Sequence, residues 1–256
     1  MVTVGRWRRA QAYERSYWEA QAQAIAAGTI SQLDWYRWRA DQLVSRLRAL
    51  GLTNLTMGGA RVLEVGCGPI GVAAFFPAIE RVAIDPLESF YALDPVLTQL
   101  RAPTVQYLEG AGEHLPCPGE RYDLAIVENC IDHVRDVQAV RGELLRVLQP
   151  DGILYLTVNF RTPWGFLVHR VLSRLNIDRG HPHTFTARRA RRLLDGRGFR
   201  ILSFEAGSTA EARLGDLRSP ELRARLKGLL GVSEATASVI AQRVTDARRA
   251  APVAVA

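Results

Sequence analysis

Apolar residues in the chain fall into short runs that predict alternating strands and helices. Six runs have the length and composition of buried strands. They cover Val62–Val65, Val82–Ile84, Val105–Leu108, Tyr122–Val127, Gly152–Val158 and Phe199–Glu205. Apolar positions at helical spacing predict helices between these runs, over Glu88–Arg101 and from Val137 to Leu148. A further helix is expected between the first two strands, and the alternation indicates an α/β fold.

The segment before the first predicted strand, residues 1–52, is expected to form a helical cap on the sheet. Leu43, Leu47 and Leu50 recur at helical spacing, and Gly51 is well placed to end a helix. Four of the chain's five tryptophans lie in this segment, at Trp7, Trp18, Trp35 and Trp38. These rings offer more aromatic surface than a small cap buries by itself. Some are therefore expected to line a binding site, with core packing as the alternative for any single ring.

The central domain is expected to span residues 53–206 and to carry a helical flap. The flap covers residues 159–184, between the fifth strand and the next helix, and is rich in large apolar side chains. Long insertions in compact domains tend to be functional lids. We therefore expect the flap to lie over a substrate site.

The last part of the chain, residues 207–256, is expected to be a helical extension. Pro220 stands at a helix start and Gly231 at its end, and Glu234 opens a second helix that runs to about Arg249. No seventh strand is expected. The extension could cover the sheet edge, complete the flap or mediate a homodimer.

Three glycines and an acid indicate a nucleotide-binding unit at the first two strands. Gly66, Gly68 and Gly71 form G-x-G-x-x-G directly after the first strand, and Asp85 ends the second. Glycine permits a positive φ and lets a ligand approach the backbone closely. An acid at that place can accept hydrogen bonds from ribose hydroxyls. The unit is therefore predicted to bind an adenosine-containing cofactor.

Glu64 distinguishes the two cofactor classes that use such a loop. A dinucleotide places its pyrophosphate at this turn, where a second carboxylate would repel it. A ligand with a cationic amino-acid head would instead be attracted. Glu64 and the first two glycines read E-x-G-x-G, which resembles the first motif of the class I S-adenosylmethionine-dependent methyltransferases. An NAD(P)-dependent oxidoreductase is the less favoured alternative.

The resemblance continues downstream, in order and at ordinary spacing. GEHLP at 112–116, RYDLAIVENCIDHV at 121–134 and LLRVLQPDGILYLTV at 144–158 are similar to the family's third, fourth and fifth strand regions. The resemblance implies a Rossmann-like, doubly wound, mostly parallel sheet. It also implies that S-adenosylmethionine is held by Glu64, Gly66, Cys67, Gly68, Gly71, Asp85, Pro86, Gly112, Glu113, Glu128 and Asn129. The chain departs from the family at Ala111, where an aspartate commonly contacts the adenine amino group.

The family resemblance also implies that a methyl acceptor binds beyond the fourth strand. Candidate acceptor-binding residues are Tyr13, Trp18, Trp164 and His181, and candidate general bases are His133 and His183. Helix packing for His133 and loop capping for the other two histidines are the structural alternatives. No carboxylate or cysteine lies close in sequence to His181 and His183, so no metal site is predicted. The acceptor is expected to be a small molecule with an apolar body.

Charge and composition argue against nucleic acid as a partner and against a membrane-spanning segment. The net charge of +7 comes almost entirely from arginine, and the arginine cluster at 188–192 lacks the interleaved aromatics of a single-strand nucleic-acid site. Nucleic acid is therefore an unfavoured partner. No apolar run reaches the roughly 20 residues of a membrane span, and the N-terminus lacks the apolar core of a signal peptide, so a cytoplasmic location is expected. Because of Ala111, a cofactor-binding protein without turnover stays an open alternative.

Overall fold

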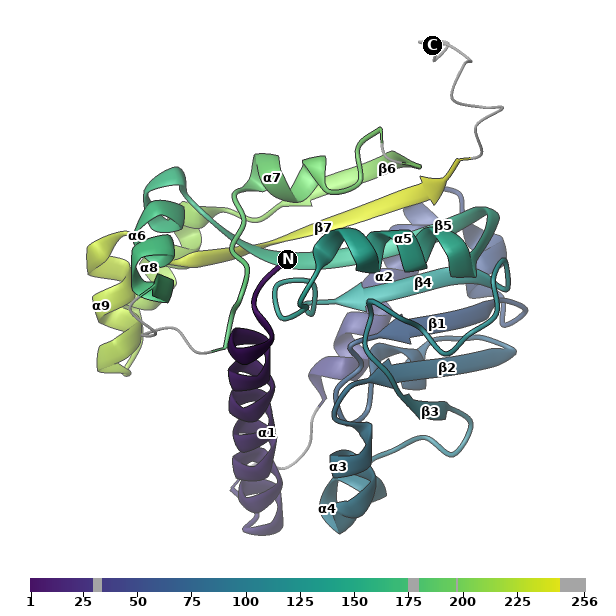
Figure 1. Ribbon diagram of the computed structural model, residues 1–256, viewed down its shortest axis with the longest axis horizontal. Helices are drawn as coiled ribbons and strands as arrows, with labels where there is room; N and C mark the ends of the chain where they lie inside the picture. The colour runs from purple at the N-terminus through teal and green to yellow at the C-terminus, as the bar shows by residue number, and fades with distance from the viewer. Residues whose placement is uncertain (30–33, 175–179, 197, 245–256) are drawn as a thin grey trace.

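A seven-stranded, mostly parallel sheet forms the centre of the molecule (Figure 1). This computed structural model describes residues 1–29, 34–174, 180–196 and 198–244. The strands lie in the order β3-β2-β1-β4-β5-β7-β6. Pairing is parallel from β3 to β5, and β7 runs antiparallel to both of its neighbours. The strands are β1 (Arg61–Val65), β2 (Glu80–Asp85), β3 (Gln106–Glu109), β4 (Tyr122–Glu128), β5 (Leu148–Arg161), β6 (Phe199–Ala206) and β7 (Glu234–Arg243). The predicted fold class is confirmed.

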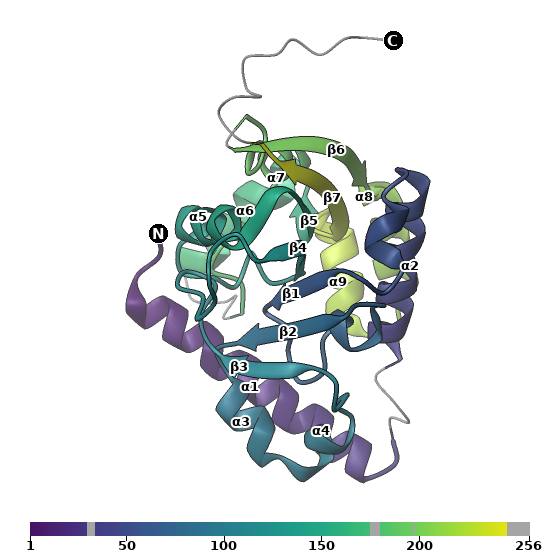
Figure 2. The ribbon, with the colours of Figure 1, turned by 90° about the vertical axis from the view of Figure 1, so that its right-hand side faces the viewer.

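Helices cover both faces of the sheet because successive strand residues point to opposite sides. In β4, Ala125 and Val127 join the core under α5 and α7, whereas Leu124 and Ile126 join the core under α2, to which α1 contributes Trp18 and Ala22. Figure 2 shows α2 and α5 on opposite sides of the sheet. The helices are α1 (Val4–Ala26), α2 (Trp35–Ala49), α3 (Glu88–Leu93), α4 (Pro95–Gln99), α5 (Val137–Val147), α6 (Pro163–Arg174), α7 (Ala187–Arg192), α8 (Thr209–Arg218) and α9 (Leu222–Leu230), with 3₁₀ turns η1 (Thr53–Thr56) and η2 (Val72–Phe75). Within the described ranges, no helix combines the length and apolarity that crossing a bilayer requires.

The N-terminal segment forms α1 and α2, and α1 lies beside the carboxyl ends of the central strands rather than on a face (Figure 1). Two long-range hydrogen bonds hold its start in this position. The backbone N–H of Val2 donates to the carbonyl of Arg135 at 2.9 Å. The guanidinium of Arg6 donates to the carbonyl of His181 at 3.0 Å. The helix is thereby tied to the loop after β4 and to the segment after α6.

The prediction of a helix from Glu234 is wrong, because this segment forms β7 between β5 and the edge strand β6. Its alternation places Ala237, Val239 and Ala241 on one face, all fully buried. Small residues have weak strand preference, so the sequence favoured a helix there. The backbone pairing available between β5 and β6 overrides that local preference. The other predicted helix of the extension is present as α9, closed by Gly231 in the left-handed conformation.

Two of the predicted helices are shorter than expected. Only the 3₁₀ turn η2 follows the glycine loop, since Pro77 comes soon after it and the next strand begins at Glu80. The helix predicted over Glu88–Arg101 is split into α3 and α4 at Asp94. Pro95 lacks the N–H needed to continue α3, and the carboxylate of Asp94 caps α4 by accepting from the next two free N–H groups.

The fifth strand is longer than predicted and takes over the start of the expected flap. It begins at Leu148, where the preceding helix was expected to end, and extends to Arg161. Asp151 adopts a positive φ of 63° in the turn at its start, as an aspartate can. The described helical part of the flap is α6, followed after the undescribed residues 175–179 by an extended segment that carries both His181 and His183.

Candidate functional site

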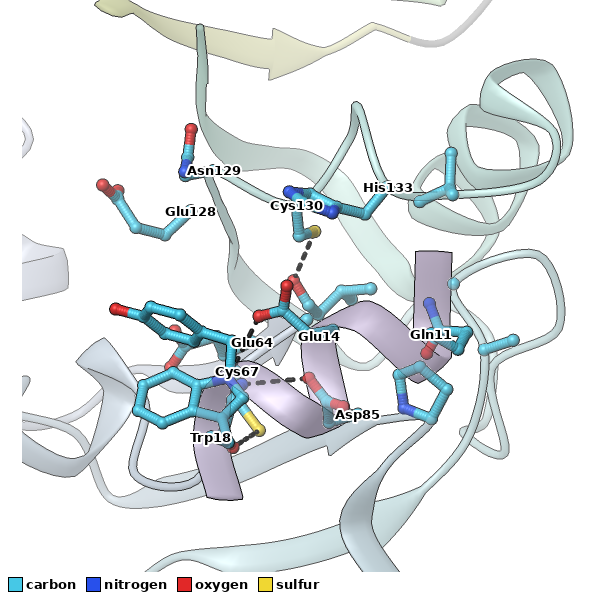
Figure 3. A pocket seen from close by; sticks show the side chains of 18 of the residues that line it. Gln11, Glu14, Trp18, Glu64, Cys67, Asp85, Glu128, Asn129, Cys130 and His133 are labelled. Carbon is cyan, nitrogen blue, oxygen red and sulfur yellow. Dashed lines mark hydrogen bonds between the residues drawn. The ribbon is translucent and has the colours of Figure 1, made fainter. Parts of the chain in front are cut away.

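A cavity of about 410 Å³ lies at the carboxyl ends of β1, β2 and β4, beside α1 and α2 (Figure 3). Ligands of open α/β sheets bind at this edge. The sheet side of the cavity brings together most of the predicted cofactor residues, which are Glu64, Gly66, Cys67, Gly68, Asp85, Pro86, Gly112, Glu113, Glu128 and Asn129. Ala111, where the chain departs from the family pattern, also lines the cavity.

The two leading glycines are required by the conformation and by the protein's own packing. Gly66 and Gly68 have φ values of 73° and 61°, which a residue with a Cβ adopts only with strain. A Cβ on Gly66 would lie 2.4 Å from the Cβ of Cys130. A Cβ on Gly68 would lie 2.8 Å from the Tyr36 hydroxyl oxygen. The loop can therefore approach a ligand with bare backbone.

Glu64 holds the start of η2 in place. Its two carboxylate oxygens accept hydrogen bonds from the N–H groups of Val72 and Ala73, at 2.9 and 2.7 Å. A dinucleotide pyrophosphate would need such N–H groups at the start of the following helix, and here a carboxylate already uses them. Burial raises the pKa of Glu64 to about 7, against the opposing effect of the two backbone hydrogen bonds. Glu64 thus disfavours a dinucleotide in two ways: it occupies the N–H groups of Val72 and Ala73, and its negative charge would repel the pyrophosphate.

Asp85 links the end of β2 to the glycine loop. One carboxylate oxygen accepts from the N–H of Leu87 at 2.9 Å, and the other accepts from the N–H of Gly68 at 3.0 Å. Burial raises the pKa of Asp85 to about 6, although both hydrogen bonds lower it. Each oxygen keeps a second lone pair for a ligand hydroxyl.

Aromatic side chains from α1 and α2 form the wall opposite the sheet. Trp18 is almost fully buried, donates from Nε1 to Glu14 at 3.0 Å, and makes an edge contact with Tyr17. Tyr36 is also buried and places its hydroxyl against the glycine loop. The same wall includes Tyr13, which is 45% exposed. Tyr13 and Trp18, predicted from the sequence, therefore do line the cavity.

Sequence reasoning missed the polar residues of this wall. Gln11 and Glu14 line the cavity and lie on the same face of α1 as Trp7 and Trp18, since positions 7, 11, 14 and 18 follow helical spacing. That spacing was the available signal. Arg39 was also missed; its Nε lies 3.5 Å from Glu128 at the end of β4.

The end of β4 carries a polar corner of the cavity. Burial raises the pKa of Glu128, while the nearby charge of Arg39 lowers it. Asn129 has a positive φ of 52°, uncommon for a residue other than glycine, and its backbone N–H donates to the Thr157 hydroxyl at 2.9 Å. Strained backbone of this kind is concentrated at functional sites.

Three polar side chains cluster farther along the same side of the cavity. Asp132 and His133 follow β4, and His181 comes from the segment after α6. The carboxylate oxygen Oδ1 of Asp132 lies 3.9 Å from Nε2 of His133, and the rings of His133 and His181 are 4.8 Å apart. His133 and His181 both line the cavity.

Three predicted site residues lie outside the lining of the cavity. Gly71 begins η2, and a Cβ there would lie 2.6 Å from the carboxylate of Glu64. His183 is half-buried behind the loop after β4, and its backbone N–H donates to the Asp132 carbonyl at 3.1 Å. Trp164 lies on α6, 59% exposed, and donates from Nε1 to the carbonyl of Leu230. Of the described flap residues, His181 lines the cavity, whereas Trp164 of α6 contacts the end of α9.

Comparison with known proteins decides the family. A profile for a methyltransferase domain matches residues 33–203, about two thirds of the chain and all of the loop, acid and β4 positions described above. The chain belongs to the class I S-adenosylmethionine-dependent methyltransferase family.

Individual relatives of this methyltransferase are distant. An uncharacterized methyltransferase from Mycobacterium sp. (strain KMS) is 33% identical over 112 residues, which is 41% of each chain. The ubiquinone biosynthesis O-methyltransferase of Azorhizobium caulinodans is 26% identical over 110 residues, 42% of this chain and 44% of the relative. The chain thus matches less than half the length of these curated relatives.

Solved structures share the fold at low identity. The geranyl diphosphate C-methyltransferase from Streptomyces coelicolor A3(2) aligns with a TM-score of 0.55 at 13% identity, over 79% of this chain and 80% of that one. The [4+2]-cyclase SpnF aligns with a TM-score of 0.53 at 21% identity, over 77% and 80%. At sequence identities this low, the similarity shows that these proteins share a fold.

The residues at the cavity fit the family's cofactor. Three buried acceptor atoms of the lining, Gln11 Oε1, Glu128 Oε2 and Asn129 Oδ1, have no hydrogen-bond partner among the described residues (Figure 3). Buried polar atoms are normally paired, so a ligand rich in donors suits them. S-adenosylmethionine offers an ammonium group, ribose hydroxyls and an adenine amino group. The acidic side chains of Asp85 and Glu128 further favour a ligand with positive charge.

Proposed function

We propose that this methyltransferase methylates a small, partly apolar acceptor that binds between α1 and the loop after β4. The observation that carries the proposal is the division of one cavity into two chemically different parts. The glycine loop, Asp85 and Glu128 form a polar part with an acid at each side. Aromatic rings of α1, of which Trp18 also packs against Gly68, and the imidazoles of His133 and His181 line the rest of the cavity. The first suits the cofactor and the second suits an acceptor with an apolar body.

Each part has a proposed task. S-adenosylmethionine supplies an electrophilic methyl group when bound, so the protein mainly aligns a nucleophile and excludes water. Asp85 holds ribose hydroxyls, Gly66 and Gly68 approach through their backbone, and Glu128 with Asn129 bonds the amino-acid head. Tyr13 and Trp18 hold the apolar body of the acceptor and exclude water. His133 and His181 activate the nucleophile at the mouth of the cavity.

A hydroxyl is the first acceptor group to screen. The partial similarity to ubiquinone biosynthesis O-methyltransferases supports an oxygen acceptor. The aromatic wall supports a ring in the acceptor, since rings stack and pack well on tyrosine and tryptophan. Phenols with an apolar substituent therefore form the starting panel, followed by amines and thiols.

Calorimetric titration with S-adenosylmethionine and S-adenosylhomocysteine tests the cofactor half of the proposal. Wild type should bind both saturably, and Asp85→Ala should weaken both by more than about tenfold, because two ribose hydrogen bonds to a charged group are lost. Asp41→Asn, an exposed acid of α2, is the matched control and should bind as wild type does. Absence of binding to wild type would refute the proposal.

Formation of S-adenosylhomocysteine in the presence of the acceptor panel tests the acceptor half. Trp18→Leu should lower acceptor turnover much more than it lowers cofactor affinity. Equal loss of both would contradict the assignment of the aromatic part to the acceptor. Cofactor binding without turnover on any acceptor class would favour the alternative of a binding protein that has lost catalysis, for which Ala111 is the motivating departure.

A further inference from the structure

Asp132, His133 and His181 present three metal-ligand side chains to one point beside the cavity. Each offers one carboxylate or imidazole atom, and these atoms all lie within 4.8 Å of one another. The sequence suggested no metal because no carboxylate lies near His181 along the chain. In the folded chain, however, the loop after β4 places Asp132 close to His181, although the two residues are far apart in sequence.

The carboxylate of Asp132 is the most informative member of the cluster. Asp132 is only 3% exposed, and its Oδ1 is a buried atom without a hydrogen-bond partner in the part of the chain that the structure describes. A buried carboxylate oxygen without a partner is costly, because it has lost its water and gained nothing in return. The Nε2 atom of His133 stands 3.9 Å from this oxygen, beyond hydrogen-bond distance. An ion between the carboxylate and the imidazoles would satisfy this oxygen.

The backbone around the cluster is fixed, so the ligands are held together without an ion. The N–H of His183 donates to the Asp132 carbonyl at 3.1 Å, which joins the two segments that supply the ligands. The N–H of His133 donates to the Cys130 carbonyl at 2.9 Å within the β4 loop. Arg6 binds the His181 carbonyl from α1. The ligand atoms lie within 4.8 Å of one another, and bonds of about 2.1 Å would bring them to a separation of about 3.0–3.4 Å.

The donor set indicates which ion would bind. Two imidazoles and one carboxylate suit zinc and the other divalent first-row transition metals, and they leave coordination positions open. Magnesium prefers an all-oxygen shell and would be a poor match. We propose that Asp132, His133 and His181 bind a divalent transition-metal ion of the zinc type beside the cavity. The open positions take an oxygen of the methyl acceptor, and this second part rests on the proposed function.

Such an ion gives the two histidines a joint role in activating the acceptor. A hydroxyl oxygen bound to the cation loses its proton more readily, and the proton leaves to solvent through the mouth of the cavity. The acceptor oxygen then presents a lone pair without a protein base. The same geometry without a metal would leave His133 as a simple general base, which the experiment distinguishes.

Direct metal binding to the full chain tests the site. The protein is freed of metal with EDTA, transferred to metal-free buffer, and titrated by calorimetry with Zn²⁺ and, separately, Mg²⁺. One Zn²⁺ per chain and no heat from Mg²⁺ are expected. Asp132→Asn and His181→Ala should each weaken Zn²⁺ binding by more than roughly 100-fold, beyond the 10–100-fold typical of second-shell changes. His114→Ala, an exposed histidine outside the cluster, should bind as wild type does.

Two spectroscopic measurements complete the test of the metal site. Co²⁺ in place of Zn²⁺ should give visible d–d bands in wild type that are lost in His181→Ala, provided that both proteins melt at similar temperatures. Addition of 4-nitrocatechol, a chromophoric oxygen chelator, should shift its absorbance only with metal-loaded wild type.

Three results would overturn the metal proposal. They are no Zn²⁺ on the folded wild type, Zn²⁺ held equally by both ligand variants, and 4-nitrocatechol spectra that the metal leaves unchanged. Binding of S-adenosylhomocysteine is measured on the same samples and tests the proposed function separately.

Discussion

Glu64 makes the clearest case for a measurable pH effect on stability. The carboxylate is buried, with its pKa raised from 4.5 to about 7. Between these two pH values the folded protein keeps a proton that the unfolded chain has released. The stabilisation is therefore fully present below pH 4.5 and is lost as the pH rises through 7. A difference of about 2.5 pKa units corresponds to roughly 3 kcal/mol of unfolding free energy.

Glu64→Gln removes this titration while keeping the shape of the side chain. The amide can accept from only one of the N–H groups of Val72 and Ala73, so the variant should be less stable than wild type at pH 4.5, by about 1–3 kcal/mol. Above pH 7.5 the gap should narrow by up to about 3 kcal/mol, because only wild type bears the cost of a buried charge.

Urea unfolding followed by circular dichroism at several pH values measures the difference. The contribution of Asp85 is common to both proteins and cancels when the two are subtracted. Glu19→Gln, on an exposed stretch of α1, is the matched control and should follow the wild-type pH profile. Parallel pH profiles for wild type and Glu64→Gln would refute the reasoning.

Three further predictions concern the loop, a helix and the cofactor. Gly68→Ala should lower both stability and S-adenosylhomocysteine affinity, because φ is 61° at this position and the added Cβ would lie 2.8 Å from the Tyr36 hydroxyl oxygen. Gly142→Ala is the matched comparison, since this glycine has open space around it in the middle of α5. It should raise the melting temperature by the equivalent of about 0.5–1 kcal/mol. Asp94→Ala should cost about 0.5–2 kcal/mol in urea unfolding, since two N–H groups of α4 lose their cap; no loss would contradict the capping role. Affinity for S-adenosylmethionine should fall as the pH drops below about 6, where Asp85 becomes protonated and offers ribose a weaker acceptor, and a flat profile by calorimetry would contradict this.

The parallel strands β1 to β5 and the glycine loop could be predicted because they depend on local signals. Apolar runs specify buried strands, and glycine next to a strand end specifies a tight turn. The chain between Arg61 and Asp85 carries both signals within one short stretch. The pattern could not show that Glu64 would bond to the backbone of η2, because that contact depends on how the turn closes.

The remaining features depend on contacts between distant segments. β7 has three alanines among its ten residues and becomes a strand because β5 and β6 both offer it hydrogen-bond partners. Asp132 meets His181 only after the loop beyond β4 packs against the segment after α6. Trp164 was expected at the acceptor site because of its size and its place in a long insertion, yet α9 supplies the carbonyl that its indole needs. Sequence spacing carries no information about such partners.

The position of β7 also determines the order in which the sheet can assemble. β6 pairs with β7 and not with β5, so it has no neighbour in the sheet until residues 234–243 have been synthesised. The strands from β1 to β5 precede it in the chain and can pair with one another earlier on the ribosome. Until β7 inserts, β5 presents a long open edge, which favours association with other chains. Translation past β7 is therefore the step that closes this edge and brings two strands into the sheet at once.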